Sequence, residues 1–115
     1  MSEHQEQAAL FEWAERVERR YPELQWLYAV PNGGHRHKLT AIKLKAEGVK
    51  PGVLDVHLDI PRHNYHGWRG ELKVNNNKPT KSQKKWIEHH KQNGYFADWF
   101  KGWDAMRENL IWYLS

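Results

Sequence analysis

Two carboxylates and a lysine fall on alternate positions of two neighbouring segments in the middle of the chain. Asp55 lies in the first of these segments, and Glu71 and Lys73 lie in the second. Hard cations such as Mg²⁺ bind one or two carboxylates together with waters and phosphate oxygens. A lysine beside such an ion can orient or deprotonate an attacking water and can stabilise charge that develops on a phosphate. These residue types therefore indicate metal-assisted chemistry on a phosphate.

The two segments, residues 53–60 and 67–74, alternate apolar and polar side chains as half-buried strands do. A short loop joins them, which favours an antiparallel hairpin. A turn centred on His63 would place Asp55 opposite Glu71. Like charges opposite each other destabilise a ladder, and a divalent cation would offset them. The alternative is a solvated polar face with a Glu71–Lys73 or Arg69–Asp salt bridge.

The remaining segments must support this hairpin. Apolar spacing, turn residues and terminal glycines predict helices over residues 3–20, 39–47, 82–93 and 103–114, with further strands over residues 24–30 and 95–100. The predicted order is helix, strand, helix, two strands, helix, strand, helix. This order indicates an α/β fold in which helices flank a single mixed sheet. The length of 115 residues is typical of one domain, residues 1–115.

Composition narrows the class of protein. The chain has no Cys, which excludes disulfides, thiolate chemistry and cysteine zinc sites. No apolar run approaches the ~18 residues of a membrane span, so we expect an intracellular, cytoplasmic protein without a membrane partner. Eighteen basic residues against fourteen acidic ones give a net charge of +4. The basic residues concentrate in residues 33–50 and 73–85, on either side of the carboxylates, which is typical of a surface for a polyanion.

Two further side chains could serve the carboxylates. Glu3 extends the apolar stripe of the first helix and would face the core, although a frayed terminus or a favourable helix dipole would also explain it. Gln83 opens the third helix among lysines, where a helix N-terminus can bind phosphate. A helix start capped by Thr80 or Ser82 is the alternative.

Several motifs together resemble a known family. Asp55 followed by Glu71-Leu72-Lys73 is similar to the core of the PD-(D/E)XK nuclease superfamily. The wider set resembles the virus-type replication-repair nuclease (VRR-NUC) domain over nearly the whole chain: Glu3-His4-x-x-Gln7-Ala-Ala-Leu, Pro31-Asn32-Gly33-Gly34-x-Arg36, Ala46-Glu47-Gly48-x-x-x-Gly52, Gly70-Glu71-Leu72-Lys73, Ser82-Gln83 with Trp86, and Gly94-Tyr95. One position departs from the family pattern, because Leu54 replaces the proline that usually precedes the aspartate.

The resemblance implies a restriction-endonuclease-like fold and a role for each matching residue. Asp55 and Glu71 would be metal ligands and Lys73 the catalytic lysine, with Gln83 supporting them and Glu3, or else Glu6, as the acid of the first helix near the metal. It also implies dependence on Mg²⁺ or Mn²⁺, cleavage of DNA phosphodiesters, and a homodimer that acts on four-way (Holliday) junctions in a bacterial or phage-infected cell. Paired active sites suit the two opposed incisions that a junction needs.

The basic segments supply candidate DNA contacts. These residues follow the Pro-Asn-Gly-Gly turn or open the third helix: Asn32, His35, Arg36, Lys38, Lys81, Lys84 and Lys85. No GxGxxG or P-loop pattern is present, so we expect no organic cofactor. Histidine pairs such as His89-His90 lack the spacing of a zinc site. Five tryptophans fit a core or a dimer interface better than base stacking: Trp13, Trp26, Trp86, Trp99 and Trp112. Trp68 and Trp103 are open to either role, and the C-terminal helix is the expected interface. A non-catalytic DNA-binding module or a simple interaction protein remains the alternative function.

Overall fold

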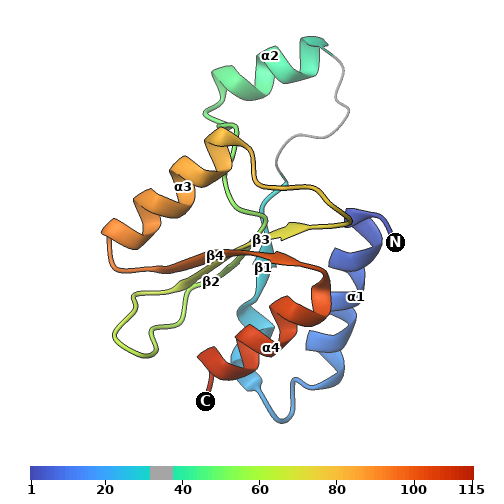
Figure 1. Cartoon of the computed structure of the whole chain (residues 1–115), viewed down its shortest axis with the longest axis vertical. Coiled ribbons are helices and arrows are strands. Elements are labelled where there is room, and N and C mark those ends of the chain that lie inside the picture. The colour runs from blue at the N-terminus through green and yellow to red at the C-terminus, as the bar shows by residue number, and fades with distance from the viewer. Residues whose placement is uncertain (32–37) are drawn as a thin grey trace.

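The computed structural model describes residues 1–31 and 38–115, with side chains described from residue 40 after the gap. Figure 1 shows the order of the elements: α1 (Glu3–Arg16), the 3₁₀ helix η1 (Pro22–Trp26), β1 (Tyr28–Ala29), α2 (Lys38–Ala46), β2 (Val56–Leu58), β3 (Trp68–Lys73), α3 (Lys81–Gln92), β4 (Phe96–Lys101) and α4 (Trp103–Tyr113). The predicted α/β class and the predicted order of helices and strands are confirmed.

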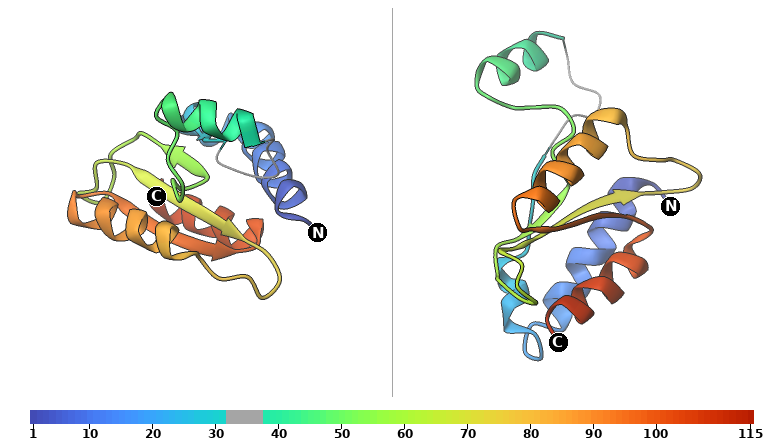
Figure 2. Two further views of the ribbon diagram at one scale, coloured as in Figure 1. Left: turned by 90° about the horizontal axis from the view of Figure 1, so that it is seen from above. Right: turned by 60° about the vertical axis from the view of Figure 1, so that its left-hand side comes forward.

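The four strands form one mixed sheet in the order β1-β2-β3-β4. The first two pairs are antiparallel, and β3 and β4 are parallel. Helices α1 and α4 pack against one face of the sheet, and α3 packs against β3 and β4 on the other (Figures 1 and 2). The side chains of β3 therefore alternate between two helical layers.

The main core lies between the sheet and the pair α1 and α4. It is built from fully buried aliphatic and aromatic side chains, among them Leu10, Leu58, Trp68, Leu72, Met106 and Leu110. The ring of Trp68 lies so close to Gly70 that a Cβ there would be 2.4 Å from it. Gly70, which directly precedes the candidate carboxylate Glu71, thus makes room for the ring of Trp68 in the core. A smaller cluster under α3 contains Leu54, Ile87 and Ala97.

The hairpin between β2 and β3 has the predicted register, but its turn is built differently. His57 pairs with Arg69, as expected. The tight turn has two central residues, His63 and Asn64, both with positive φ, and the Tyr65 N–H donates to the Arg62 carbonyl at 2.7 Å. An additional residue on the β2 side of this turn restores the register that a turn centred on His63 alone would give.

Three predicted elements are shorter than expected. The predicted strand 53–60 is a strand only over Val56–Leu58. The first helix ends at Arg16 and not at residue 20, and a turn follows it. The predicted strand 24–30 is a strand only at its end, because Pro22 starts the 3₁₀ helix η1 that occupies its first half. Helix α2 is largely exposed, including Ile42, and projects from the body of the domain (Figure 1). None of the helices in the described part of the chain is long and apolar enough to span a membrane.

Candidate active site

The face of β3 that points toward α3 carries the predicted chemistry. Asp55 lies immediately before β2, and its Oδ2 accepts a hydrogen bond from the Leu72 N–H of β3 at 3.0 Å. This bond fixes the aspartate beside the strand that carries Glu71. Glu71 and Lys73 are adjacent on the same face of that strand, one pleat apart. The two strands thus bring the three residues together as the sequence predicted.

Glu71 is the most deeply buried of the acidic residues, with 1% of its surface exposed. Its Oε2 accepts a hydrogen bond from Gln83 Nε2 at 2.9 Å and lies 3.8 Å from Lys73 Nζ. Its Oε1 is buried and has no hydrogen-bond donor among the described residues. A carboxylate oxygen in that position has an unsatisfied capacity to bind a proton or a cation.

The electrostatics of Glu71 reflect this environment. Burial, and next the negative charge of Asp55, raise its pKa to about 9, while the positive charge of Lys73 opposes the rise. The raised pKa favours retention of a proton by this pair of carboxyls when no cation is present. A divalent ion would replace that proton and relieve the repulsion between the two carboxylates.

Gln83 connects the site to α3. Its backbone N–H donates to Thr80 Oγ1 at 3.2 Å and its Oε1 accepts from the Thr80 N–H at 2.8 Å, which forms a capping box. Its Nε2 is left to hold Glu71. The two interpretations of this residue from the sequence are therefore compatible, because one amide both caps the helix and contacts the carboxylate.

The two acidic residues of the first helical turn have different surroundings. Glu3 is exposed, and its negative charge contributes to the raised pKa of Glu71. Glu6 Oε2 accepts a hydrogen bond from the Trp103 N–H at 2.8 Å. It thereby provides an acceptor for a backbone N–H at the start of α4 that has no partner within the helix. Glu6 is thus engaged outside the site, which leaves Glu3 as the acid of α1 that acts on it.

The two carboxylates of the site are candidate ligands for a divalent cation. In residues 1–31 and 38–115, no group of three or more His, Asp or Glu side chains is arranged to hold a metal ion. Glu3 is therefore not a third ligand beside Asp55 and Glu71 in this conformation. Two carboxylates with an unpartnered buried oxygen still fit Mg²⁺ or Mn²⁺, because Mg²⁺ commonly keeps several waters and takes one or two carboxylates.

The other half of the same sheet face has paired charges. Asp59 accepts from Arg69 at 2.8 Å and from the Tyr28 hydroxyl at 2.8 Å. His57 Nε2 lies 3.0 Å from the Leu54 carbonyl oxygen, and burial and the charge of Arg69 lower its pKa to about 4. Sequence reasoning missed Tyr28, which lay within the predicted strand 24–30 without any motif to single it out.

The alternative of a solvated polar face is wrong, although both of its salt bridges exist. His57, Arg69, Glu71 and Lys73 are all less than 10% exposed because α3 covers them. Trp68, whose role the sequence left open, is a core residue, whereas Trp26 and Trp112 are exposed.

The basic residues predicted to contact DNA are only partly described. Lys81, Lys84 and Lys85 are exposed on the first turns of α3, close along the helix to Gln83. Lys38 begins α2. Asn32, His35 and Arg36 lie outside the described residues, so their role as DNA contacts stays a prediction.

Comparisons with known proteins bear on the whole chain. No protein-family model matches the sequence, and no curated protein matches it. A solved structure described as a VRR_NUC domain protein is similar in fold, with a TM-score of 0.83 and 29% sequence identity over 99% of this chain and 88% of that chain. The family motifs that place Asp55, Glu71 and Lys73 coincide with the carboxylates and lysine that the structure brings together. This likeness supports a VRR-NUC domain with a nuclease-type fold.

Proposed function

We propose that this protein is a metal-dependent DNA endonuclease, with Mg²⁺ or Mn²⁺ held by Asp55 and Glu71. The observation that carries the proposal is the buried Glu71 carboxyl, which has one unpartnered oxygen and lies beside a second carboxylate and a lysine. A site that only bound DNA would gain nothing from buried carboxylates, because they repel phosphate. A bound divalent cation would polarise a phosphate oxygen and lower the pKa of a water.

The residues of the chain itself divide the remaining work. Lys73, whose Nζ lies 3.8 Å from Glu71 Oε2, would orient an attacking water and stabilise charge that develops on the phosphate. Gln83 holds Glu71 in one orientation, and Asp55 is held by the backbone of β3. Glu3 contributes negative charge at the edge of the site. The exposed lysines at the start of α3 bind the phosphates on either side of the one that is cut.

The finer part of the proposal concerns the substrate. We propose that the enzyme acts as a homodimer on four-way DNA junctions, because two symmetric sites suit paired incisions in opposed strands. Helix α4 is the proposed interface. Its Trp112 is 43% exposed and stacks on His63 from the β2–β3 hairpin, so the two elements present one surface.

Cleavage assays test both levels of the proposal. A labelled four-way junction and a linear duplex of the same sequence are incubated with Mg²⁺, with Mn²⁺ and with chelator, and Lys73→Met serves as the inactive control. We expect cuts only with metal, in pairs near the branch point of the junction. Equal cutting of both DNAs would keep the endonuclease and overturn the junction preference. Binding without cleavage in either metal would show that the protein is a non-catalytic DNA-binding module.

A further inference from the structure

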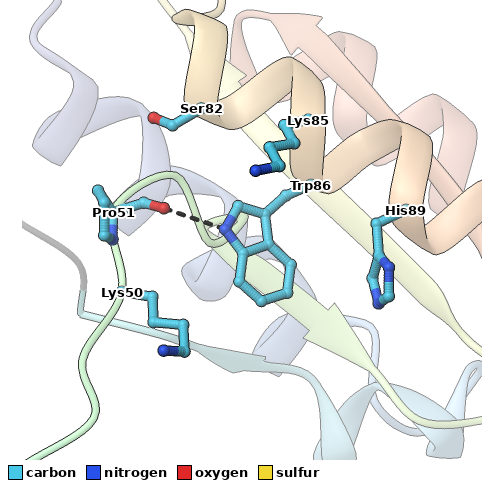
Figure 3. A pocket seen from close by; sticks show the side chains of 6 residues that line it. All are labelled: Lys50, Pro51, Ser82, Lys85, Trp86 and His89. Atoms are coloured by element: carbon cyan, nitrogen blue, oxygen red, sulfur yellow. Dashed lines mark hydrogen bonds between the residues drawn. The ribbon is translucent and has the colours of Figure 1, made fainter.

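A cavity of about 420 Å³ lies between α3 and the segment that leads into β2. Figure 3 shows the described residues that line it, which come from these two elements: Lys50, Pro51, Ser82, Lys85, Trp86 and His89. The volume falls in the range of small-molecule sites. The sequence assigned Trp86 to a core or an interface, but its indole is only partly buried and forms a wall of this cavity.

A hydrogen bond and a closely packed glycine fix one wall of the cavity. Trp86 Nε1 donates to the Pro51 carbonyl oxygen at 3.0 Å (Figure 3). The next residue, Gly52, has a φ of +86°, and a Cβ there would lie 2.6 Å from the backbone of Ser82. Only glycine allows the segment to pass this close to α3. The tryptophan and the loop therefore hold each other in place and keep the shape of the cavity.

The lining has a definite chemistry. Trp86 offers an aromatic surface, and Lys50 and Lys85 bring two exposed ammonium groups from two different elements. No acidic residue is among the described residues that line the cavity. The matching occupant has a planar uncharged ring attached to an anion. A nucleotide with an unstacked base meets both requirements, because bases stack on tryptophan and lysines neutralise the neighbouring phosphate.

The position of the cavity relates it to the candidate active site. Gln83, which contacts Glu71, precedes Trp86 by three residues on α3, about 5 Å along the helix axis. We propose that this cavity binds one unpaired nucleotide of the strand that is cut, next to the phosphate at Asp55 and Glu71. The proposal rests on the proposed function and refines its substrate: DNA with an unpaired base beside the cleavage site, as at a branch point. A fully paired duplex would first have to release a base from its stack.

A binding measurement without metal isolates this contact. Two labelled duplexes carry one extra nucleotide at the same position, either with its base or as an abasic residue, and their dissociation constants are measured by fluorescence anisotropy in chelator. We expect the protein to bind the DNA with the base about 10-fold more tightly, as is typical of one stacked base. Trp86→Leu should bring the ratio of the two constants to about 1, whereas Trp86→Phe should keep most of it.

Matched variants control for general effects. Trp26 is 61% exposed in η1, so Trp26→Leu removes an equally large indole elsewhere and should keep the 10-fold ratio. Lys50→Gln should weaken the binding of both DNAs by the same factor and reduce the salt dependence of binding, because it removes a phosphate contact. Lys91→Gln at the far end of α3 should change the salt dependence less.

Each outcome separates the cavity from the nuclease. A ratio near 1 for the unmodified protein, or a ratio that survives Trp86→Leu, overturns the nucleotide subsite. If Trp86→Leu does not fold, two other variants decide the question. A ratio near 1 in Lys50→Gln, or in Trp86→Phe, also overturns the nucleotide subsite. Cleavage with metal but no discrimination against the abasic DNA refutes the subsite and leaves the nuclease standing. Discrimination without any cleavage supports the subsite and refutes the nuclease.

Discussion

Two halves of one sheet face have opposite electrostatic balance. In the half near Asp59, the buried Arg69 is paired with a carboxylate at 2.8 Å, and His57 is neutral. In the half near Glu71, a buried carboxyl lies beside a second one, with a lysine at 3.8 Å. The same two strands and the same helix build both halves.

The difference shows where a ligand is needed. The Asp59 half retains unpartnered nitrogens on Arg69 and His90, but its charges already compensate each other. In the Glu71 half, one lysine faces two carboxyls, so a proton or a bound cation would stabilise the buried Glu71. Burial of polar groups is common to both halves, so burial alone does not identify the site. The uncompensated negative charge near Glu71 identifies it.

The largest expected effect separates the two halves by activity. Glu71→Gln and Lys73→Met should each lower the rate of DNA cleavage by at least about 100-fold, because they remove groups that act on the reacting phosphate. Asp59→Asn should leave the rate within about 3-fold while lowering the free energy of unfolding by about 1 kcal/mol, since its side chain is more than half exposed. Glu71→Gln should leave stability unchanged or raise it. Single-turnover cleavage and urea unfolding measure both quantities, and a similar loss of activity in Asp59→Asn would contradict the comparison.

The second effect is a pH dependence of opposite sign in the two halves. Glu71 has its pKa raised from 4.5 to about 9, so the folded state binds the extra proton and the free energy of unfolding falls as pH rises across this range. His57 has its pKa lowered from 6.5 to about 4, so its contribution is lost as pH falls through this range. Each proton changes the slope by at most about 1.4 kcal/mol per pH unit.

Urea unfolding in chelator between pH 4 and 9 checks this pair of slopes. We expect Glu71→Gln to flatten the decline above pH 6.5 and His57→Asn to flatten the rise below it. Saturating Mn²⁺ should also remove the decline, because the ion replaces the proton on Glu71. A decline that is unchanged in Glu71→Gln would show that other groups cause it.

The strand pairing was the most predictable part of the fold. Alternation along residues 53–60 and 67–74 fixes which side chains share a face, and a one-residue slip would have moved Glu71 into the apolar core. The register was correct although the turn has two central residues, because the burial pattern and not the turn determines it. The 3₁₀ helix η1 was missed because the prediction rested on apolar and aromatic content. Leu24 and Leu27 are three residues apart and both pack in the core, whereas in a strand they would point to opposite faces.

The residues of the candidate site were predictable from the sequence, but their burial and their long-range contacts were not. Spacing placed Asp55, Glu71 and Lys73 together, yet nothing in the local sequence showed that Glu71 and Lys73 would be buried. The contact of Trp86 with Pro51 joins positions 35 residues apart and has no periodic signal. Such long-range contacts depend on the packing of α3, which local patterns do not encode.

A third, smaller effect compares the two capping boxes. Ser2 with Gln5 caps α1, and Thr80 with Gln83 caps α3, by the same reciprocal hydrogen bonds. Gln5→Ala and Gln83→Ala should both lower the free energy of unfolding by about 1 kcal/mol. Only Gln83→Ala should also slow cleavage, by about 10-fold, because only that amide holds a site carboxylate. Equal cleavage rates in the two variants would mean that Gln83 is a helix cap alone.

The smallest effect distinguishes the two acidic residues in the first turn of α1. Glu3→Gln removes a charge that acts on Glu71 and should weaken Mn²⁺ binding a few-fold without loss of stability, because Glu3 is exposed. Glu6→Gln weakens the hydrogen bond to the Trp103 N–H and should lower the free energy of unfolding by about 1 kcal/mol with unchanged metal affinity. Isothermal titration with Mn²⁺ beside urea unfolding measures both. The reverse pattern would assign the metal-facing acid to Glu6 and require α1 to rotate toward the site when the cation binds.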